Sequence, residues 1–328
     1  MTKRREFLTM SAAAAASYLI APATTYAQSS LPKGPITLVV PFAAGGATDV
    51  VSRLLAKKVT DKTGVSIVVD NVAGGGGVVG AAKVVRSNKD GSVLLMGTVS
   101  THAINPLARA TPPYDCLKDF TPISLVATVP NVILVNNSVK AQNLKELIAM
   151  LKADPNKYSY GTSGVGTPPH LSGELFKTMA GVEMAHVPYR GGGPAMTDLI
   201  SGQIPILFDV LTGAASHIKS GAVRAIAVTT NSRVASFPNI TTVAEAGLPG
   251  YETYTWNAIF GPAGVPQNVA EALSREFQKA VAEPDVQEKL RDLSATPVGS
   301  TPEALNTHVK AELNKWGKVI KAIDLKLD

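Results

Sequence analysis

Cysteine and aromatic side chains are scarce in this chain of 328 residues. The chain contains one cysteine, Cys116, so an internal disulfide and a multi-cysteine zinc or iron–sulfur site are both excluded. Aromatic residues make up only 5%, whereas 28 glycines and 22 prolines predict many tight turns and close backbone approaches. With 45% hydrophobic and 17% charged residues, the composition is that of a folded protein of about two domains.

A concentrated basic patch is also missing, although the formal net charge is +6 (31 basic minus 25 acidic residues). The first 27 residues hold three of the basic and one of the acidic residues, so the rest of the chain carries 28 against 24, or +4. The remaining lysines and arginines are dispersed and not interleaved with aromatic residues, so nucleic-acid binding is not supported. A mild positive bias suits a small anionic ligand, although ordinary surface lysines produce the same balance.

The first 27 residues differ in kind from the rest. Basic residues at Lys3–Arg5 precede an apolar run over Met10–Ala21 and a small-x-small end at Thr25–Ala27. This order is typical of a secretory signal peptide, so we expect export and cleavage near Ala27. The RRxFL pattern of residues 4–8 also resembles a twin-arginine signal, with the general secretory route as the alternative. The apolar run is shorter than the ~20 residues that a membrane-spanning helix needs.

Short β-branched runs alternate with helical periodicity along the rest of the chain, which predicts an α/β protein with parallel sheets in two doubly wound lobes. The predicted strands are 35–41, 65–69, 93–96, 132–135, 157–160, 183–188, 204–208, 223–229 and 251–260. The predicted helices are 47–59, 78–85, 144–153, 168–180 and 194–201, followed by three that begin near 269, 285 and 302. Ligands of open α/β sheets lie beyond the carboxyl ends of the strands, so loops there are candidate sites.

One such loop is residues 41–49, PFAAGGATD. Its glycine pair lets backbone N–H groups turn inward, and Thr48 and Asp49 are suited to cap the following helix. Exposed N–H groups at the positive end of a helix dipole form a cradle for a carboxylate or phosphate. The alternative is a plain turn in which the glycines only relieve strain.

A second loop of this kind is residues 161–170, GTSGVGTPPH. Here Thr167 is the predicted N-cap, and Pro168 occupies the first helical position, where proline is favoured. This loop is a second predicted anion cradle, and one cradle per lobe indicates a ligand with two acidic ends. His170 lies near the helix start, where a packed or capping histidine is the commoner role.

Several other side chains follow predicted strands. Arg190 stands beside Tyr189 in a glycine-rich turn and is suited to a carboxylate, or is an ordinary surface arginine. Asp209 ends the strand 204–208 and is suited to a ligand hydroxyl or amine, or only caps the next helix. Ser100 and His102 follow the strand 93–96 and are weaker candidates for ligand contacts.

Two motif matches point elsewhere and are weak. Residues 75–80, GGGVVG, fit the dinucleotide-binding pattern, but the acidic residue expected about 20 positions later is missing. Residues 161–165 begin like the nucleophile elbow of hydrolases, yet Val165 replaces the final glycine. Ser163 is therefore expected to donate a hydrogen bond to an anion. An exported serine hydrolase using Ser163 with His170 or another histidine is the alternative. We expect neither a metal nor a cofactor.

The mature chain resembles the periplasmic solute-binding proteins of tripartite tricarboxylate transporters, the Bug or TctC-like family, over about residues 34–325. The resemblance is carried by residues 41–49 (PFAAGGATD), 101–106 (THAINP), 114–127 (YDCLKDFTPISLVA), 161–171 (GTSGVGTPPHL), 187–204 (VPYRGGGPAMTDLISGQI), 223–229 (VRAIAVT), 237–252 (FPNITTVAEAGLPGYE) and 315–321 (KWGKVIK). The residues 71–78, NVAGGGGV, depart from the family's usual Asn-Arg-Pro-Gly-Ala-Gly-Gly-Asn. If that stretch approaches the cleft, the site is less polar and suits an aromatic or longer acid; if it lies at the back, it says nothing about the ligand.

The resemblance implies a non-enzymatic, two-lobed periplasmic binding protein of type II-like fold, with a ligand cleft between the lobes. Lobe 1 would comprise residues 31–126 and 253–328, and lobe 2 residues 127–252. The ligand would be an organic acid, usually a dicarboxylate, passed by a monomeric receptor to a permease; a receptor that signals to a partner is the alternative. Carried over, the ligand-binding residues would be Phe42, Ala43, Gly46, Thr48 and Asp49 at one carboxylate, Ser163, Gly166, Thr167 and His170 at the other, and Tyr189, Arg190 and Asp209 along the wall of lobe 2.

Overall fold

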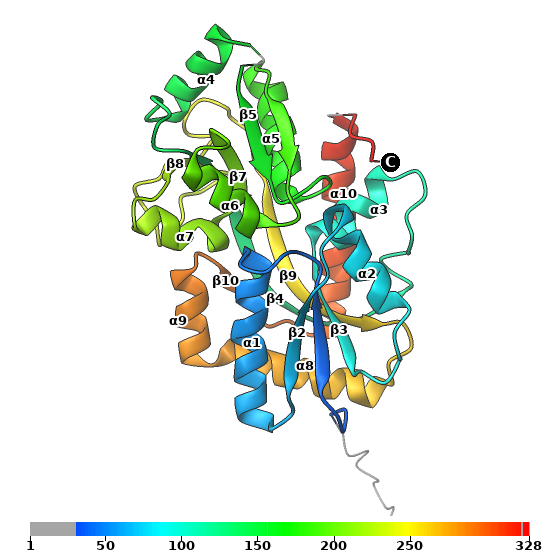
Figure 1. Ribbon diagram of the computed structural model, residues 1–328. Helices are drawn as coiled ribbons and strands as arrows, with labels where there is room; N and C mark the ends of the chain where they lie inside the picture. The colour runs from blue at the N-terminus through cyan, green and yellow to red at the C-terminus, as the bar shows by residue number, and fades with distance from the viewer. Residues whose placement is uncertain (1–30, 156, 323, 328) are drawn as a thin grey trace, which may run out of the picture.

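The structure is a computed structural model that describes residues 31–155, 157–322 and 324–327. The predicted signal peptide, residues 1–27, lies outside the described residues. Two α/β lobes lie end to end, and the strands β4 (Phe120–Val135) and β9 (Tyr254–Pro262) run in the region where they meet (Figure 1). Within the described part of the chain, no helix combines the length and the apolarity needed to cross a bilayer.

Lobe 1 is built on a sheet with strand order β2-β1-β3-β9-β4, and β10 pairs with the other side of β4. The first three strands are β1 (Ile36–Val40), β2 (Ile67–Asn71) and β3 (Val93–Thr98), and β10 is Thr296–Pro297. Strands β1, β2 and β3 are parallel, which confirms the predicted βαβαβ unit, whereas β9 is antiparallel to both β3 and β4.

Both faces of the lobe 1 sheet are covered by helices. Successive side chains of β1 point to opposite faces, so they contribute to two different cores. Leu38 packs in one core with Val51 and Leu273, and Val39 packs in the other with Trp316. The first core is covered by α1 (Ala47–Thr63), α8 (Gln267–Ala282) and α9 (Pro284–Asp292). The second is covered by α2 (Val78–Val85), α3 (Asn105–Ala108) and α10 (Pro302–Ala322), so the C-terminal helices complete the N-terminal lobe.

Lobe 2 repeats this arrangement with strand order β4-β7-β5-β6, and β8 pairs with the other side of β4. Its strands are β5 (Ser159–Thr162), β6 (Ala185–Pro188), β7 (Ile206–Val210) and β8 (Arg224–Val228). One face is covered by α4 (Leu144–Ala153) and α5 (Pro168–Ala180), and the other by α6 (Gly192–Ser201) and α7 (Leu211–Lys219). The predicted helices 78–85, 144–153 and 168–180 are confirmed with the same bounds.

Strand β4 belongs to both sheets. Up to Pro130 it pairs with β9, and from Asn131 onward it pairs with β7 and β8. The sequence predicted only its last part, 132–135, because Pro122 and Pro130 argue against a long strand. Both prolines are accommodated, with a register shift in the pairing after Pro122. The lobe boundaries at 126/127 and 252/253 lie close to this change of partner and stay a prediction.

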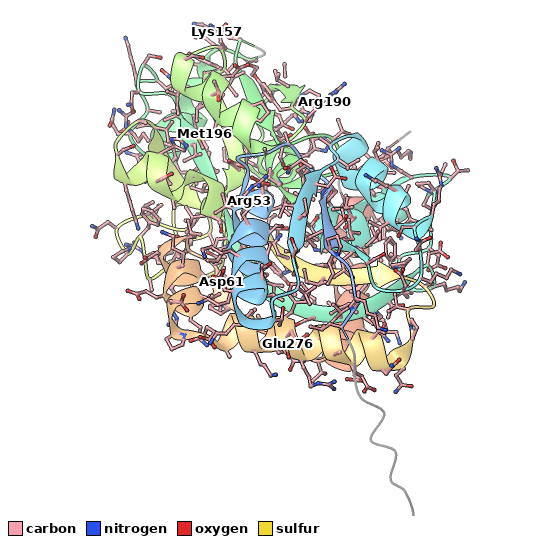
Figure 2. The ribbon with its side chains drawn as sticks, turned by 60° about the horizontal axis from the view of Figure 1, so that its bottom comes forward. Arg53, Asp61, Lys157, Arg190, Met196 and Glu276 are labelled. Atoms are coloured by element: carbon pink, nitrogen blue, oxygen red, sulfur yellow. The ribbon has the colours of Figure 1, made fainter. Side chains whose placement is uncertain are left out.

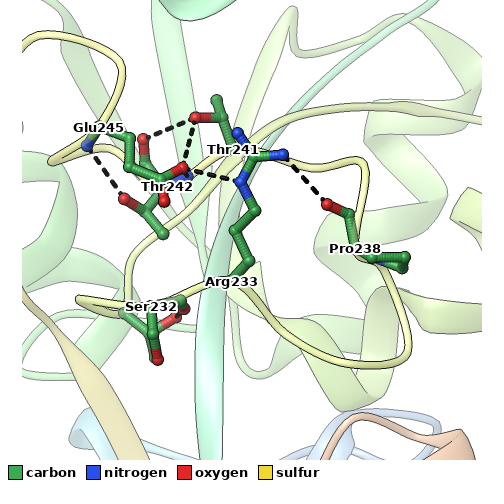
Figure 3. A network of polar contacts seen from close by, with 7 residues as sticks. Ser232, Arg233, Pro238, Thr241, Thr242 and Glu245 are labelled. Carbon is green, nitrogen blue, oxygen red and sulfur yellow. Dashed lines mark hydrogen bonds and ion pairs between the residues drawn. The ribbon is translucent and has the colours of Figure 1, made fainter.

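The connection from β8 back to β9 is ordered by one carboxylate (Figure 3). Glu245 accepts hydrogen bonds from Arg233 Nε at 2.9 Å and from the Thr241 hydroxyl at 3.0 Å. Arg233 also donates to the carbonyl of Pro238 at 3.1 Å. The hydrogen bond from Arg233 is the main cause of the lowered pKa of Glu245. These contacts fix the return segment internally, and a bridge between Thr242 and Val228 of β8 attaches it to the lobe 2 sheet.

Candidate ligand-binding cleft

A small cavity of about 30 Å³ lies between the lobes, where three helices begin. Six of its lining residues were expected from the sequence: Phe42, Gly46, Thr48, Ser163, Thr167 and Asp209. Eight were not: Ala47, Thr98, Pro168, Pro169, Gly192, Val210, Thr255 and Asn257. We call this space the inner cavity.

The inner cavity is electrostatically suited to an anion although no lysine, arginine or histidine is among the residues that line it. The N-termini of α1, α5 and α6 reach it through Ala47, Pro168 and Gly192. A helix N-terminus carries a partial positive charge and unpaired N–H groups, so three of them attract a carboxylate without any cationic side chain.

The lobe 1 loop, residues 41–49, is shaped by Asp49. Its carboxylate accepts hydrogen bonds from Gly45 N, Arg53 Nε and Asn71 Nδ2, each at 3.0 Å. Burial alone would raise the pKa of Asp49, but the hydrogen bonds, led by that from Arg53, outweigh it and lower the pKa. Asp49 is 4% exposed and does not line the inner cavity, so it supports the loop from behind.

The helix cap differs from the predicted one at this loop. The N-cap of α1 is Gly46, which has no side chain to cap, and Thr48 already lies inside the helix. Asp49 instead reaches back to the N–H of Gly45, four residues earlier. The first-turn N–H groups of α1 therefore remain available to another acceptor at the inner cavity.

The lobe 2 loop, residues 161–167, is shaped by hydroxyl groups and a histidine. Thr167 is the N-cap of α5, as predicted, and its hydroxyl donates to the carbonyl of Gly164 at 2.6 Å. His170 Nδ1 accepts from Gly166 N at 3.2 Å, and burial lowers the pKa of this histidine. Because Pro168 and Pro169 have no N–H, this loop offers fewer backbone donors than the lobe 1 loop. Its hydroxyl-bearing residues at the inner cavity are Ser163 and Thr167.

Direct contacts join the two lobes across the cleft. Ala43 N of lobe 1 donates to the carbonyl of Arg190 in lobe 2 at 2.9 Å. The Ser100 hydroxyl lies 2.6 Å from the carbonyl of Gly166, to which Asn105 Nδ2 also donates at 3.1 Å. The backbone at Gly76 passes so close to Val165 that a side chain at Gly76 would overlap the Val165 carbonyl. The structure therefore represents the lobes in contact.

The other predicted site residues lie away from the inner cavity. Ala43 and Gly166 take part in the interlobe contacts just described. Tyr189 donates its hydroxyl to Asp198 at 2.7 Å, and the exposed Arg190 is directed outward from lobe 2 (Figure 2). His102 is fully buried and stacked on Phe260 at 3.8 Å between ring centroids, and burial lowers its pKa to about 3. That is the environment of a core histidine.

The stretch 71–78 does not reach the inner cavity but lines another part of the space between the lobes. Its glycines at 74–77 line a separate pocket of about 220 Å³ together with Phe42, Ser163, Tyr189 and Arg190. Phe42 and Ser163 line both spaces.

Asp209 is the one carboxyl group that lines the inner cavity among the described residues. It is 2% exposed, and burial raises its pKa to about 7. It also lines a pocket of about 390 Å³, the outer pocket, which shares Gly46 and Gly192 with the inner cavity. His217 is the basic side chain on the wall of the outer pocket.

Sequence reasoning missed the floor of the inner cavity. Thr98 at the end of β3 faces Asn257 of β9 across the antiparallel pair, and Thr255 lies two residues further along β9. The Thr98 hydroxyl is buried and has no hydrogen-bond partner among the described residues. The pairing of β3 with β9 brings these side chains together, and no short-range pattern in the sequence predicts that pairing.

The fold and the cleft together define a two-lobed solute-binding protein. The chain belongs to the tripartite tricarboxylate transporter family receptors, whose family model matches residues 51–325. This is a family of periplasmic receptors rather than enzymes. In keeping with that, no hydrogen bond joins Ser163 to a histidine within the described ranges, and the hydrolase alternative is not retained.

Named relatives share most of their length with this chain. It is 38% identical over 292 residues to the UPF0065 protein in the tcbD-tcbE intergenic region of Pseudomonas sp. (strain P51), covering 89% of this chain and 87% of that protein. It is 34% identical to Protein BugT of Bordetella pertussis, covering 90% and 91%.

Solved structures show the same two-lobed fold. Rpa4515 of R. palustris with adipate has a TM-score of 0.88 and 37% identity, covering 90% of this chain and 99% of that chain. Periplasmic binding protein BugD has a TM-score of 0.87 and 34% identity, covering 90% and 99%. MatC (Rpa3494) of Rhodopseudomonas palustris with bound malate has a TM-score of 0.84 and 30% identity, covering 88% and 100%.

Proposed function

We propose that this protein is a monomeric periplasmic receptor that binds a dicarboxylate between its lobes and delivers it to a permease of the tripartite tricarboxylate type. One observation carries the proposal: helix N-termini from both lobes converge on a cavity that no basic side chain lines among the described residues. Such a site suits a ligand with an acidic group toward each lobe. The adipate and malate bound in two solved relatives support this class of ligand.

Binding is coupled to movement of the lobes. The inner cavity of about 30 Å³ has room for about two water molecules, which is less than the carbon chain of a dicarboxylate occupies. The ligand therefore enters when the lobes part, and it favours closure because it contacts both lobes at once. The expected ligand-binding residues remain the twelve named from the sequence, and Thr98, Thr255 and Asn257 join them as the floor.

Export belongs to the same proposal. Residues 1–27 have the composition of a signal peptide, and cleavage near Ala27 would release a mature chain of +4 net charge. Mass determination of the protein recovered from a periplasmic extract tests this directly: a mass that retains the first 27 residues contradicts it.

The ligand class is tested by a thermal-shift panel on the mature protein. The panel contains adipate, malate, acetate, an aromatic dicarboxylate and the uncharged diamide of adipate. A dicarboxylate present at 100 times its dissociation constant adds about 2.7 kcal/mol of stability, and the diamide adds none. An aromatic acid that stabilises more than adipate would place the ligand against Phe42 in the pocket beside residues 74–77. A panel in which no acid raises the melting temperature contradicts the proposal.

The variant Ser163→Ala tests whether the Ser163 side chain contacts the ligand. Ser163 lines the inner cavity, so loss of its hydroxyl is expected to weaken dicarboxylate binding about fivefold while the melting temperature without ligand is unchanged. Ser87→Ala is the matched control, because the Ser87 hydroxyl donates to Val84 within its own helix end.

A further inference from the structure

Asp209 is placed where an anionic ligand is expected. It ends β7 and lines both the inner cavity and the outer pocket. A side chain at Gly192 would lie only 2.9 Å from Asp209 Oδ1, so the first residue of α6 packs directly on the carboxyl group. Gly213 in the first turn of α7 approaches it in the same way, at 3.6 Å from Oδ2. The carboxyl thus occupies helix N-terminal positions that also attract a ligand carboxylate.

Asp209 takes part in none of the ion pairs formed among the described residues. The ionisable side chains on the elements around it include Asp49, Arg53, Tyr160, His170, Glu174, Lys177, Asp198, His217 and Lys219. Helix α1 also carries Lys57, Lys58, Asp61 and Lys62 in its later turns, and all four are in ion pairs there. Most of the side chains around Asp209 already have a partner. Arg53 is bonded to Asp49, Tyr160 and Lys177 are bonded to Glu174, and Asp198 is bonded to Tyr189. Two are bonded to the backbone: Lys219 to the carbonyl of Asp292, and His170 to the N–H of Gly166. Only His217 shares a pocket with Asp209.

Two negative charges cannot share this site at low cost. An ionised Asp209 and a ligand carboxylate would compete for the same helix N-termini and repel each other, because no cationic side chain of the described residues lines the inner cavity. A protonated Asp209 removes the repulsion and supplies an O–H donor, and a hydrogen bond from an acid to a carboxylate is a strong one.

We propose that the receptor binds its dicarboxylate together with one proton, which Asp209 holds and donates in a hydrogen bond to the ligand. This inference rests on the proposed function and adds its proton stoichiometry. The proton comes from solvent, and no bond other than the O–H of Asp209 is formed or broken. The raised pKa of Asp209, about 7 because of burial, agrees with it, since half of the carboxyl groups are then protonated near neutral pH.

The linkage has a definite sign. A bound dianion raises the pKa of Asp209 further, so the complex holds more protons than the free protein above about pH 7. Affinity is then constant below that pH and falls up to tenfold for each unit above it. Between pH 6 and pH 8.5 the dissociation constant is expected to rise about 30-fold.

The experiment is isothermal titration of the mature protein with adipate and with malate from pH 6 to 8.5, in phosphate and in Tris buffers. The dependence of the heat on the buffer's ionisation enthalpy gives the number of protons taken up, expected near one at pH 8. Asp209→Asn keeps the shape and a donor, so it is expected to bind with a flat pH profile and no proton uptake. His217→Gln is the control and is expected to keep the pH dependence and the proton uptake of the wild-type protein.

L-aspartate provides a matched ligand, because it carries an ammonium where malate carries a hydroxyl. If Asp209 acts as a neutral donor, aspartate gains nothing from it and binds no more tightly than malate. Tighter binding of aspartate without proton uptake would show an ionised Asp209 and overturn the inference. So would loss of all binding in Asp209→Asn, or proton uptake that disappears in His217→Gln instead.

The proposed function is judged separately. If adipate or malate binds the wild-type protein with the same affinity at pH 6 and pH 8.5, the proton linkage is wrong and the receptor function stands. If no acid binds at any pH, the receptor proposal itself fails, and the inference fails with it.

Discussion

The two loops that meet at the inner cavity are held by different parts of the molecule. The lobe 1 loop, residues 41–49, is anchored inside its own lobe by the Asp49 carboxylate. The lobe 2 loop, residues 161–167, has its internal bonds to Thr167 and His170, but its Gly166 carbonyl is bound by Ser100 and Asn105 of lobe 1. The Asp49-anchored end of the first loop is therefore held within lobe 1, although Ala43 N at its other end donates to the Arg190 carbonyl of lobe 2. The second loop is completed by the contact between the lobes.

This difference suggests an order of events. A loop whose geometry does not depend on closure can receive the first carboxylate in the open protein, because its N–H groups are already oriented. A loop that is completed by the opposite lobe holds the second carboxylate only once the lobes close. Closure would thus be favoured by the ligand and by the Ser100 and Asn105 contacts together.

Removing Asp49 is expected to have the largest effect, because it lowers both stability and affinity. Asp49→Ala removes the buried acceptor of Gly45 N and Arg53, and because both donors are exposed to solvent the unfolding free energy falls by only about 1 kcal/mol. It also disorders the loop at the N-terminus of α1, so dicarboxylate affinity falls at least tenfold. Chemical denaturation and titration calorimetry measure the two effects.

Asp61→Ala is the control for that variant. Asp61 lies on the same helix, at the end away from Arg53 (Figure 2), and pairs with Lys57 in an exposed position. Its removal is expected to change neither stability nor affinity measurably. If Asp49→Ala destabilises no more than Asp61→Ala, the lobe 1 loop is not anchored by the carboxylate.

Keeping the lobes apart should affect the second loop more than the Asp49-anchored end of the first. Gly193 in α6 faces the Ala44 carbonyl of lobe 1, and a side chain there would lie 2.6 Å from it. Gly193→Ala is therefore expected to cost the closed form about 2 kcal/mol and to weaken binding roughly 30-fold. Hydrogen exchange should show faster exchange at Gly166 and no change at Gly45.

Gly34→Ala controls for the gain of a methyl group, since nothing lies within 4 Å of that position. Equal loss of protection at Gly45 and Gly166 in Gly193→Ala would mean that both loops depend on closure, against the comparison drawn above.

A smaller effect is expected from Ser100, which the sequence placed among the weaker ligand contacts. Its hydroxyl lies 2.5 Å from the carbonyl of Gly76 and 2.6 Å from that of Gly166, and its single proton serves one of them at a time. Ser100→Ala removes the contact with Gly76 inside lobe 1 in both forms and the contact with Gly166 in the closed form. Because the second loss affects only the closed form, affinity is expected to fall about fivefold, through a faster dissociation rate. An unchanged dissociation rate in stopped-flow measurements would remove Ser100 from the interlobe contact.

The sequence predicts those parts of the site that depend on neighbouring residues in the chain, and it does not predict those that depend on contacts between distant segments. Thr167 and Pro168 form a local cap signal, and α5 begins where that signal places it. The contact of Ser100 with Gly166 has no local signal, because it depends on how two separately folded lobes meet. Strand β4 was predicted in part, since prolines that are tolerated at its irregular positions read as strand breakers.

The pH dependence of the two loops provides the finest distinction. The pKa of His170 is lowered by burial, so the unfolded chain binds the proton more readily and the stabilisation from neutral His170 declines as the pH falls below about 6.5. Protonation also removes the Nδ1 acceptor of Gly166 N.

The pKa of Asp49 is lowered from 3.8, so the stability that its carboxylate contributes is complete above that pH and is lost only as the pH falls further, through the pKa of the folded state. Between pH 7 and pH 5 the protection factor of the Gly166 amide is therefore expected to fall severalfold while that of Gly45 is constant. Parallel loss at both amides would show that the loops share one anchor.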